Sequence, residues 1–263
     1  MERREFLKAS LVGGLTPFAF ANNIEMKGNM SLEYYELRKY YLLNRTKQKL
    51  LDDYLSNVAI PAMNRIGIGP VGVFNVVYGP DSSTIYVLLV YKSLELFASA
   101  TSRLLTDAEY QKSGESFINA SISEPLYVRM ENSLMVAFER MPKLKVPEST
   151  EKKEPRIFEL RTYESHSIKA GKKKIEMFNE GGEIDIFRKT GLQPVFFGET
   201  LIGQRLPNLN YMLVFNDMIA RDKQWEVFRS DSDWKKLSTD TKYADTVSNI
   251  TDIILQPTPY SQI

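Results

Sequence analysis

A Glu-x-Arg-x-Tyr pattern occurs twice in this chain of 263 residues. Residues two apart on a β-strand share a face, so each copy would present a carboxylate, a guanidinium and a phenol side by side. Such a trio could bind a small organic ligand, because Arg can hold an anionic or carbonyl group while Tyr donates and Glu accepts. It could equally form a structural ion-pair network. The candidate ligand-binding residues are Glu36, Arg38, Tyr40, Glu159, Arg161 and Tyr163.

The apolar neighbours of the second trio suggest how it is oriented. Phe158 and Leu160 alternate with the trio, and so they lie on the opposite face of the strand. We expect Phe158 and Leu160 to pack against helices, and Glu159, Arg161 and Tyr163 to face the interior of a barrel. An unpaired charge in such an interior is costly, so Glu159 and Arg161 are expected to pair.

Composition excludes several kinds of active site. The chain has no Cys and one His, which excludes disulfides, thiolate nucleophiles, iron–sulfur clusters and every site that needs two histidines. Neither a phosphate-binding Gly-x4-Gly-Lys-Ser/Thr loop nor a Gly-x-Ser-x-Gly nucleophile motif is present. The lone His166 could act as a general base or a haem ligand, but its polar loop favours a surface position. We expect no metal and no cofactor.

The charge balance limits the partners of this protein. Lys and Arg number 34 against 33 Asp and Glu, a net charge of +1. That balance gives no electrostatic argument for a nucleic acid or an anionic membrane surface. No apolar run reaches the roughly 20 residues that a transmembrane helix needs. We therefore expect a small organic ligand or a protein partner, and oligomerisation stays open.

Two further clusters of side chains have structural interpretations. Trp225, Phe228 and Trp234 recur at roughly helical intervals and are expected to pack in the core, the alternative being an aromatic wall of a ligand site. The three lysines at 172–174 are followed by acidic residues, which is typical of a solvated, partly paired helix face.

The chain contains an internal repeat. Three pairs of segments match in order at offsets of 123 to 125 positions: 35–40 with 158–163, 67–71 with 191–195, and 86–90 with 211–215. Matches at nearly constant spacing predict two homologous halves, residues 32–141 and 156–263. Between them, residues 142–155 are charged and bounded by prolines, and we interpret them as a linker.

Each half has the same expected order of elements. In the first half we expect strand 33–41, helix 45–66, strands 71–78 and 84–91, helices within 93–120 and strand 132–139. In the second half we expect strand 156–164, helix 167–190, strands 193–201 and 209–216, helices within 217–243 and strand 248–256. This βαββαβ order predicts an α+β fold of two tandem ferredoxin-like units. Each unit would cover the bare sheet face of the other, giving an intramolecular dimeric α+β barrel.

The second half resembles a NIPSNAP domain. The resemblance lies in segments 158–163, 191–195 and 207–211 and in the pattern Arg221-x3-Trp225-x2-Phe228-x2-Asp231-x2-Trp234. The first half shows the opening strand and a Gly-x-Gly-Pro turn at 67–70 but lacks the tryptophan block. The resemblance implies a dimeric α+β barrel, in a superfamily that includes small monooxygenases, haem-binding enzymes and isomerases. NIPSNAP proteins have no settled catalytic activity, so the resemblance implies a fold more firmly than a reaction.

Two functions from different classes fit these residues, and the sequence leaves open whether the protein is an enzyme. The first is a non-catalytic module that binds a small ligand or another protein. The alternative is a cofactor-independent monooxygenase- or isomerase-like enzyme with its site inside the barrel, beside Glu159, Arg161 and Tyr163. The composition, which lacks Cys and nucleophile motifs, favours the first.

The N-terminus is typical of an export signal. Residues 1–21 combine Arg3 and Arg4 with a short apolar run and a small-residue end at 19–21. The Arg-Arg-x-Phe-Leu-Lys order resembles a twin-arginine signal, although Glu2 stands where Ser or Thr is usual. A general secretory signal is the alternative. We expect a signal peptide at 1–21, a polar spacer at 22–31 and a location in the bacterial periplasm.

Overall fold

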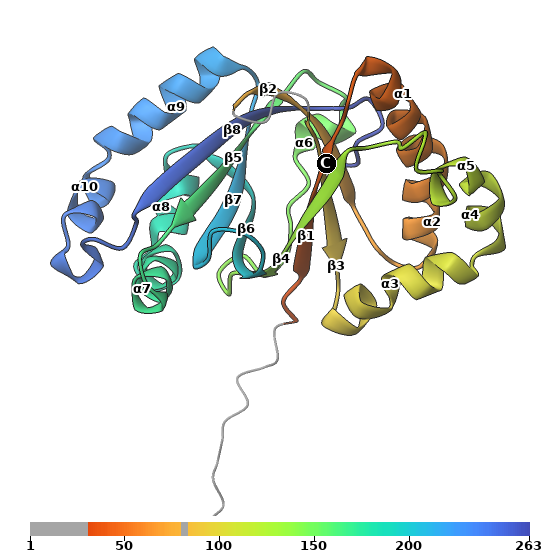
Figure 1. Ribbon diagram of the computed structural model, residues 1–263. Helices are drawn as coiled ribbons and strands as arrows, with labels where there is room; N and C mark the ends of the chain where they lie inside the picture. Colours follow the sequence, from red (N-terminus) through yellow and green to blue (C-terminus); the bar gives the residue numbers. More distant parts are fainter. Residues whose placement is uncertain (1–30, 80–83) are drawn as a thin grey trace, which may run out of the picture.

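The computed structural model describes residues 31–79 and 84–263, which form two repeats joined by a linker (Figure 1). The expected signal peptide, and all but the last residue of the expected spacer, lie outside these described residues. The first repeat consists of β1 (Tyr34–Tyr41), α1 (Arg45–Tyr54), the π-helical turn η1 (Leu55–Ala59), α2 (Ile60–Arg65), β2 (Val71–Tyr78), β3 (Thr84–Tyr91), α3 (Leu94–Thr106), α4 (Ala108–Ser113), α5 (Glu115–Ile118) and β4 (Arg129–Ala137). The helical region expected at 93–120 forms three helices, α3, α4 and α5.

The second repeat follows the same order after a linker that contains the short helix α6 (Glu148–Glu151). Its elements are β5 (Ile157–Glu164), α7 (Ile168–Asn179), α8 (Glu183–Lys189), β6 (Gln193–Ile202), β7 (Asn208–Phe215), α9 (Met218–Ser230), α10 (Ser232–Ser238), the 3-10 turn η2 (Thr241–Tyr243) and β8 (Asn249–Pro257).

Corresponding helices begin at corresponding residues, and this sets the alignment of the two repeats. The side chain of Ser93 accepts a hydrogen bond from the third backbone N–H of α3, and Asp217 does the same for α9. Such caps satisfy backbone donors that have no partner within the helix. Because Ser93 and Asp217 hold the same position, residues 124 apart in α3 and α9 lie at equivalent places.

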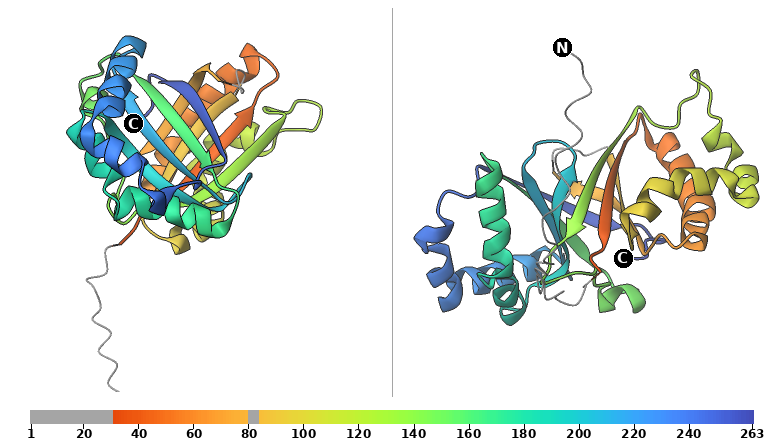
Figure 2. Two further views of the ribbon diagram at one scale, coloured as in Figure 1. Left: turned by 90° about the vertical axis from the view of Figure 1, so that its left-hand side faces the viewer. Right: turned by 90° about the horizontal axis from the view of Figure 1, so that it is seen from below.

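The eight strands form one closed antiparallel barrel in the order β1-β3-β2-β8-β5-β7-β6-β4. Each repeat supplies four neighbouring strands, and the repeats join where β2 pairs with β8 and β4 pairs with β6. Figures 1 and 2 show the helices of the first repeat on one side of the barrel and those of the second on the other. A single chain therefore closes the barrel.

The barrel interior is mostly apolar and contains Phe158 and Leu160 rather than the polar trios, so the expected orientation of the trios was wrong. Phe158 and Leu160 point inward, and the ring of Phe158 lies 5.0 Å from that of Phe74 in the other repeat. Glu159, on the opposite face, points outward toward the helices. The interior is walled by strands on every side and shared by both repeats, so apolar side chains gain most by filling it. The inward-facing core also includes Tyr35, Leu37, Tyr86, Leu88, Met135, Val195, Phe196, Met212 and Leu255.

Two further apolar cores lie between the barrel wall and the helices. The first includes Leu51, Leu55, Val87, Leu89, Tyr91 and Leu104, and the second includes Phe178, Phe187, Tyr211, Leu213, Trp225 and Phe228. The polar trios lie in these helix-covered layers. No helix within residues 31–79 and 84–263 is both long and apolar enough to cross a membrane.

Candidate functional site

The second trio is the centre of a dense buried network. Glu159 is fully buried and accepts a hydrogen bond from Nη1 of Arg161 at 2.8 Å. Its carboxylate also accepts two bonds from Arg221 of α9, from Nη2 at 2.7 Å and from Nε at 3.0 Å. The indole Nε1 of Trp225 donates a further bond at 2.7 Å. One carboxylate therefore joins β5 to α9 through two cations and an indole.

Aromatic rings close this network. The guanidinium of Arg161 lies 4.9 Å from the ring centre of Trp225 and 5.6 Å from that of Tyr163. The hydroxyl groups of Tyr163 and Tyr211 are 2.9 Å apart and hydrogen-bonded. Cations over aromatic faces are stabilised by the negative face of the ring. The second trio thus forms the packed ion-pair network that was the structural alternative, although on the outer face of the barrel wall.

A second buried ion pair lies beside this network. Lys174 donates to Glu183 at 2.7 Å, and both side chains are almost wholly buried. The Lys174 ammonium also lies 4.6 Å from the ring centre of Phe178. Burial raises the pKa of Glu183, and the Lys174 charge opposes that rise. The expectation of a solvated face at 172–174 is therefore wrong for Lys174, which reaches into the helix-covered core.

The first trio makes a comparable but less enclosed network. Glu36 is buried and accepts two bonds from Arg38, from Nε at 2.7 Å and from Nη2 at 2.9 Å. Its other donors are the amide of Asn132 at 2.7 Å and the hydroxyl of Tyr91 at 2.6 Å. Burial raises the pKa of Tyr40, which is nearly fully buried beside Arg38. Arg38 is thus the cation that neutralises Glu36 within the described part of the chain.

A cavity of about 260 Å³ lies beside this first trio, between the barrel wall and the helices. We call it the tyrosine cavity, because most of its aromatic lining is tyrosine. Three of its lining residues are exposed, namely Thr101, Leu105 at 45% and Met130 at 38%, so the cavity reaches the surface. The lining consists of Arg38, Tyr40, Tyr54, Leu55, Met63, Ile68, Tyr91, Ala100, Thr101, Leu104, Leu105, Tyr110, Phe117, Tyr127 and Met130.

The repeat alignment explains why a cavity lies beside Arg38 whereas the equivalent place beside Arg161 is filled. Thr101 of α3 holds the place of Trp225 in α9, 124 positions later. The buried indole of Trp225 lies over Arg161, whereas the exposed and smaller Thr101 borders the cavity that Arg38 also lines. The same shift places Phe97 where Arg221 stands in the second repeat. The first repeat therefore lacks both the indole and the second cation that seal the site around Glu159.

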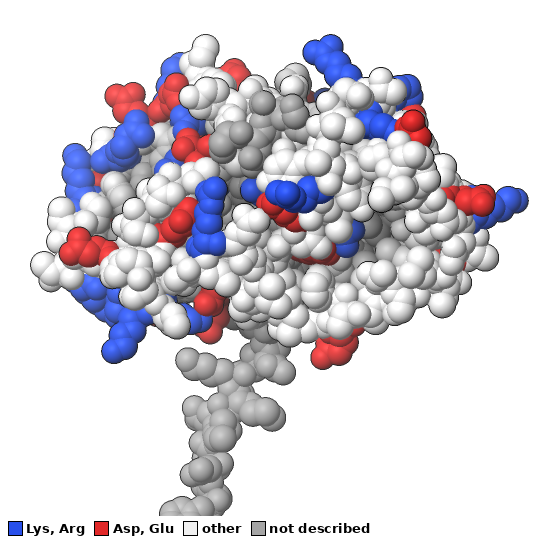
Figure 3. All heavy atoms as spheres, viewed as in Figure 1, with Lys and Arg blue, Asp and Glu red and all other residues white. Residues whose placement is uncertain are grey.

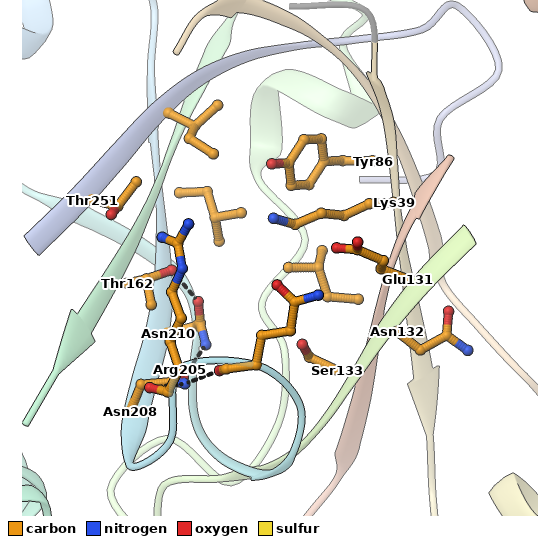
Figure 4. A pocket seen from close by; sticks show the side chains of 14 residues that line it. Lys39, Tyr86, Glu131, Asn132, Ser133, Thr162, Arg205, Asn208, Asn210 and Thr251 are labelled. Carbon is orange, nitrogen blue, oxygen red and sulfur yellow. Dashed lines mark hydrogen bonds between the residues drawn. The ribbon is translucent and has the colours of Figure 1, made fainter. Parts of the chain in front are cut away.

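Figure 4 shows another pocket, of about 110 Å³, at one end of the barrel interior. Both repeats line it, with Lys39 and Tyr86 from the first and Thr162 and Asn210 from the second. Thr162 donates to the side-chain oxygen of Asn210 at 2.5 Å, and the Asn210 amide donates to Asn208 at 3.0 Å. Because these polar groups bond to one another, they need no ligand to satisfy them.

The structure thus brings the six predicted residues into two separate groups, one per repeat. Arg38 and Tyr40 line the tyrosine cavity, while Glu159, Arg161 and Tyr163 lie within packed structure. Sequence reasoning missed the cavity tyrosines, which include Tyr54, Tyr91, Tyr110 and Tyr127. The available signal was the lack of a tryptophan block in the first half, since a missing large side chain leaves space.

The other predicted roles can also be placed. His166 is exposed, as expected. Trp225 and Phe228 are buried in the second helix-covered core, with Trp234 packed against it, as the core interpretation predicts. No cluster of three or more metal-binding side chains occurs among the described residues. On the face shown in Figure 3, Lys and Arg side chains are interspersed with Asp and Glu.

The NIPSNAP family model matches residues 35–141 and 158–262, which together make up more than half of the chain. This chain belongs to the NIPSNAP family. The match includes the first repeat, which has the tyrosine cavity and lacks the tryptophan block. No curated protein matches the chain at a significant level.

Several solved structures have a similar fold, and the proteins in them have different descriptions. A proposed monooxygenase from Fusobacterium nucleatum superimposes with a TM-score of 0.55 at 11% identity, covering 86% of this chain and 93% of that one. An anthrone oxidase-like protein gives a TM-score of 0.50 at 10% identity, covering 86% and 91% of the two chains. A NIPSNAP family protein from Agrobacterium tumefaciens is 21% identical over 41% of this chain and 91% of its own, with a TM-score of 0.36. At these identities the first two likenesses show the fold alone.

Proposed function

We propose that this NIPSNAP protein is a non-catalytic binding module whose small organic ligand occupies the tyrosine cavity. One observation carries the proposal: the same Glu-Arg-Tyr trio is sealed by Trp225 in the second repeat but borders a cavity in the first. The sealed copy shows what a purely structural version of this trio looks like. The open copy departs from it at Thr101, where a larger side chain would close the space.

The cavity leaves aromatic and aliphatic side chains without protein packing partners on one side. Protein interiors are close-packed, and large apolar cavities are typical of binding sites rather than of structural cores. The cavity contains one guanidinium among otherwise uncharged lining residues, as expected of a site that orients a ligand with few polar groups.

Filling the cavity by Thr101→Trp tests this proposal. We expect the full chain, purified from its own host, to carry a co-purified small molecule in native mass spectrometry and the Thr101→Trp variant to carry none. The variant should melt at or above the temperature of the ligand-free wild type, because the indole fills existing space. Thr101→Val, which keeps the volume of Thr101, is the matched control and should retain the ligand. Equal ligand occupancy in the tryptophan variant would contradict the proposal.

A cofactor-independent monooxygenase- or isomerase-like activity is the second candidate. Apolar side chains fill most of the barrel interior, and Thr162, Asn208 and Asn210 in the small pocket at its end bond to one another, so we place such chemistry in the tyrosine cavity. Arg38 and neighbouring tyrosines there could stabilise an oxyanion that develops on a substrate. Oxygen consumption with hydroxylated aromatic substrates, measured for wild type and Thr101→Trp, separates this candidate from simple binding.

Two further proposals concern the export of the protein and the fold of each repeat. We propose that residues 1–21 direct export to the periplasm, supported by Arg3, Arg4 and the small-residue end of that segment. N-terminal sequencing of mature protein should then begin near Asn22, and an intact Met1 would refute it. We also propose that each repeat is a ferredoxin-like unit, supported by its four adjacent antiparallel strands.

A further inference from the structure

The tyrosine cavity is nearly neutral in charge. Arg38 is the one charged residue in its lining, and two hydrogen bonds of 2.7 and 2.9 Å tie this guanidinium to Glu36. The bonds that Asn132 and Tyr91 donate to Glu36 carry no charge. The positive charge of Arg38 is therefore already balanced, and an anionic ligand would add an uncompensated negative charge near a buried carboxylate.

Besides Arg38, the polar side chains of the cavity are hydroxyls, each of which can donate one hydrogen bond and also accept. The hydroxyls of Tyr54 and Tyr110 lie 2.7 Å apart, and within the described residues each has no other hydrogen-bond partner. In such a pair one hydroxyl donates to the other, which leaves the proton of the second hydroxyl available. Burial raises the pKa of Tyr54, so its phenol stays protonated at neutral pH. The pair can thus donate one hydrogen bond to an oxygen atom on a ligand.

The remaining walls of the cavity are flat or apolar. The rings of Tyr54 and Phe117 stack with centres 3.6 Å apart and planes inclined by 3°. Tyr127 and Tyr40 form an edge-on pair with centres 5.3 Å apart. Aliphatic side chains such as Leu104 complete the lining. Walls of this kind pack best against a rigid ring, because aromatic contacts favour offset stacking and edge-to-face arrangements.

We infer that the ligand of the tyrosine cavity is a neutral, flat ring compound with an oxygen atom that accepts a hydrogen bond from the Tyr54–Tyr110 pair. This inference rests on the proposed function, because it specifies the chemistry of the same site. It excludes carboxylates and phosphates as preferred ligands.

Three probes of similar shape test the inference: 2-naphthol, which is neutral at pH 7, the anion 2-naphthoate, and naphthalene, which has no oxygen. We expect the full chain to bind 2-naphthol at least ten-fold more tightly than 2-naphthoate in fluorescence titrations. Thr101→Trp should abolish the binding, and Thr101→Val should preserve it. The double variant Tyr54→Phe with Tyr110→Phe should lose the preference for 2-naphthol over naphthalene while still binding both.

The results separate an error in the chemistry of the ligand from an error in the location of the binding site. Tighter binding of 2-naphthoate than of 2-naphthol, abolished by Thr101→Trp, would overturn the neutral-ligand inference and leave the cavity as the binding site. An unchanged preference for 2-naphthol in the double tyrosine variant would overturn the assigned donor pair. Binding of no probe, or binding that Thr101→Trp does not affect, would overturn the proposed function and the inference with it.

Discussion

Replacing Arg161 by Met should destabilise the protein, and the structure gives the size of the effect. The substitution removes the charge-assisted bond to Glu159, worth about 1.5–3 kcal/mol, and the contact with the Trp225 ring, worth about 0.5–1 kcal/mol. Glu159 keeps its bonds from Arg221 and Trp225, so it is not left as an unpaired buried charge. The expected loss in the free energy of unfolding is about 2–4 kcal/mol. At about 2–4 °C per kcal/mol for a domain of 150–250 residues, the melting temperature should fall by roughly 4–16 °C.

Arg38→Met in the first repeat is the matched comparison. Here the substitution removes both bonds from the cation that neutralises Glu36, leaving a buried carboxylate with the uncharged donors Asn132 and Tyr91. Loss of one partner of a buried pair typically costs about 3–5 kcal/mol. We therefore expect Arg38→Met to destabilise the protein more than Arg161→Met, although the two residues occupy equivalent positions.

Urea and thermal unfolding of ligand-free wild type and both variants at pH 7 provide the measurement. An unchanged or higher melting temperature for Arg161→Met would refute the structural role of the second trio. A larger loss for Arg161→Met than for Arg38→Met would refute the reasoning that the number of remaining cations decides the cost.

Three other predictions concern the buried pair and the barrel. Glu183→Leu should cost about 3–5 kcal/mol, because it leaves the buried Lys174 ammonium without its partner. The double change Lys174→Met with Glu183→Leu should cost much less, and urea unfolding compares the two variants. Burial raises the pKa of Glu183 in the folded state. The contribution of Glu183 to the free energy of unfolding should therefore be greatest below its unfolded-state pKa and decline as pH rises through the folded-state pKa. A pH series in which the stabilities of the wild type and the double variant change identically would contradict this. Residues 156–263 expressed alone should form dimers or aggregates, because the apolar barrel interior becomes exposed. Size-exclusion chromatography with light scattering measures this, and a stable monomer would show that the fragment does not need the first repeat.

Much of the fold follows from local patterns in the sequence. Strands expected at 71–78 and 84–91 were found with those bounds, because each is a short run of β-branched and aromatic residues. The three matching segment pairs predicted two repeats, and both carry the family match. The composition also limited the site chemistry, since a chain without Cys and with one exposed His has few conventional catalytic groups.

The orientation of the strands and the location of the cavity depended on the tertiary structure. Alternation with period two shows that Phe158 and Glu159 lie on opposite faces, but it is symmetric and does not say which face is inside. Closure of the barrel decided this, because the shared interior excludes water from every side and so takes the apolar face. The contrast between Thr101 and Trp225 was present in the sequence as a difference between two helices. Only the packing of those helices over Arg38 and Arg161 turned that difference in side-chain volume into a cavity in one repeat and a sealed ion-pair network in the other.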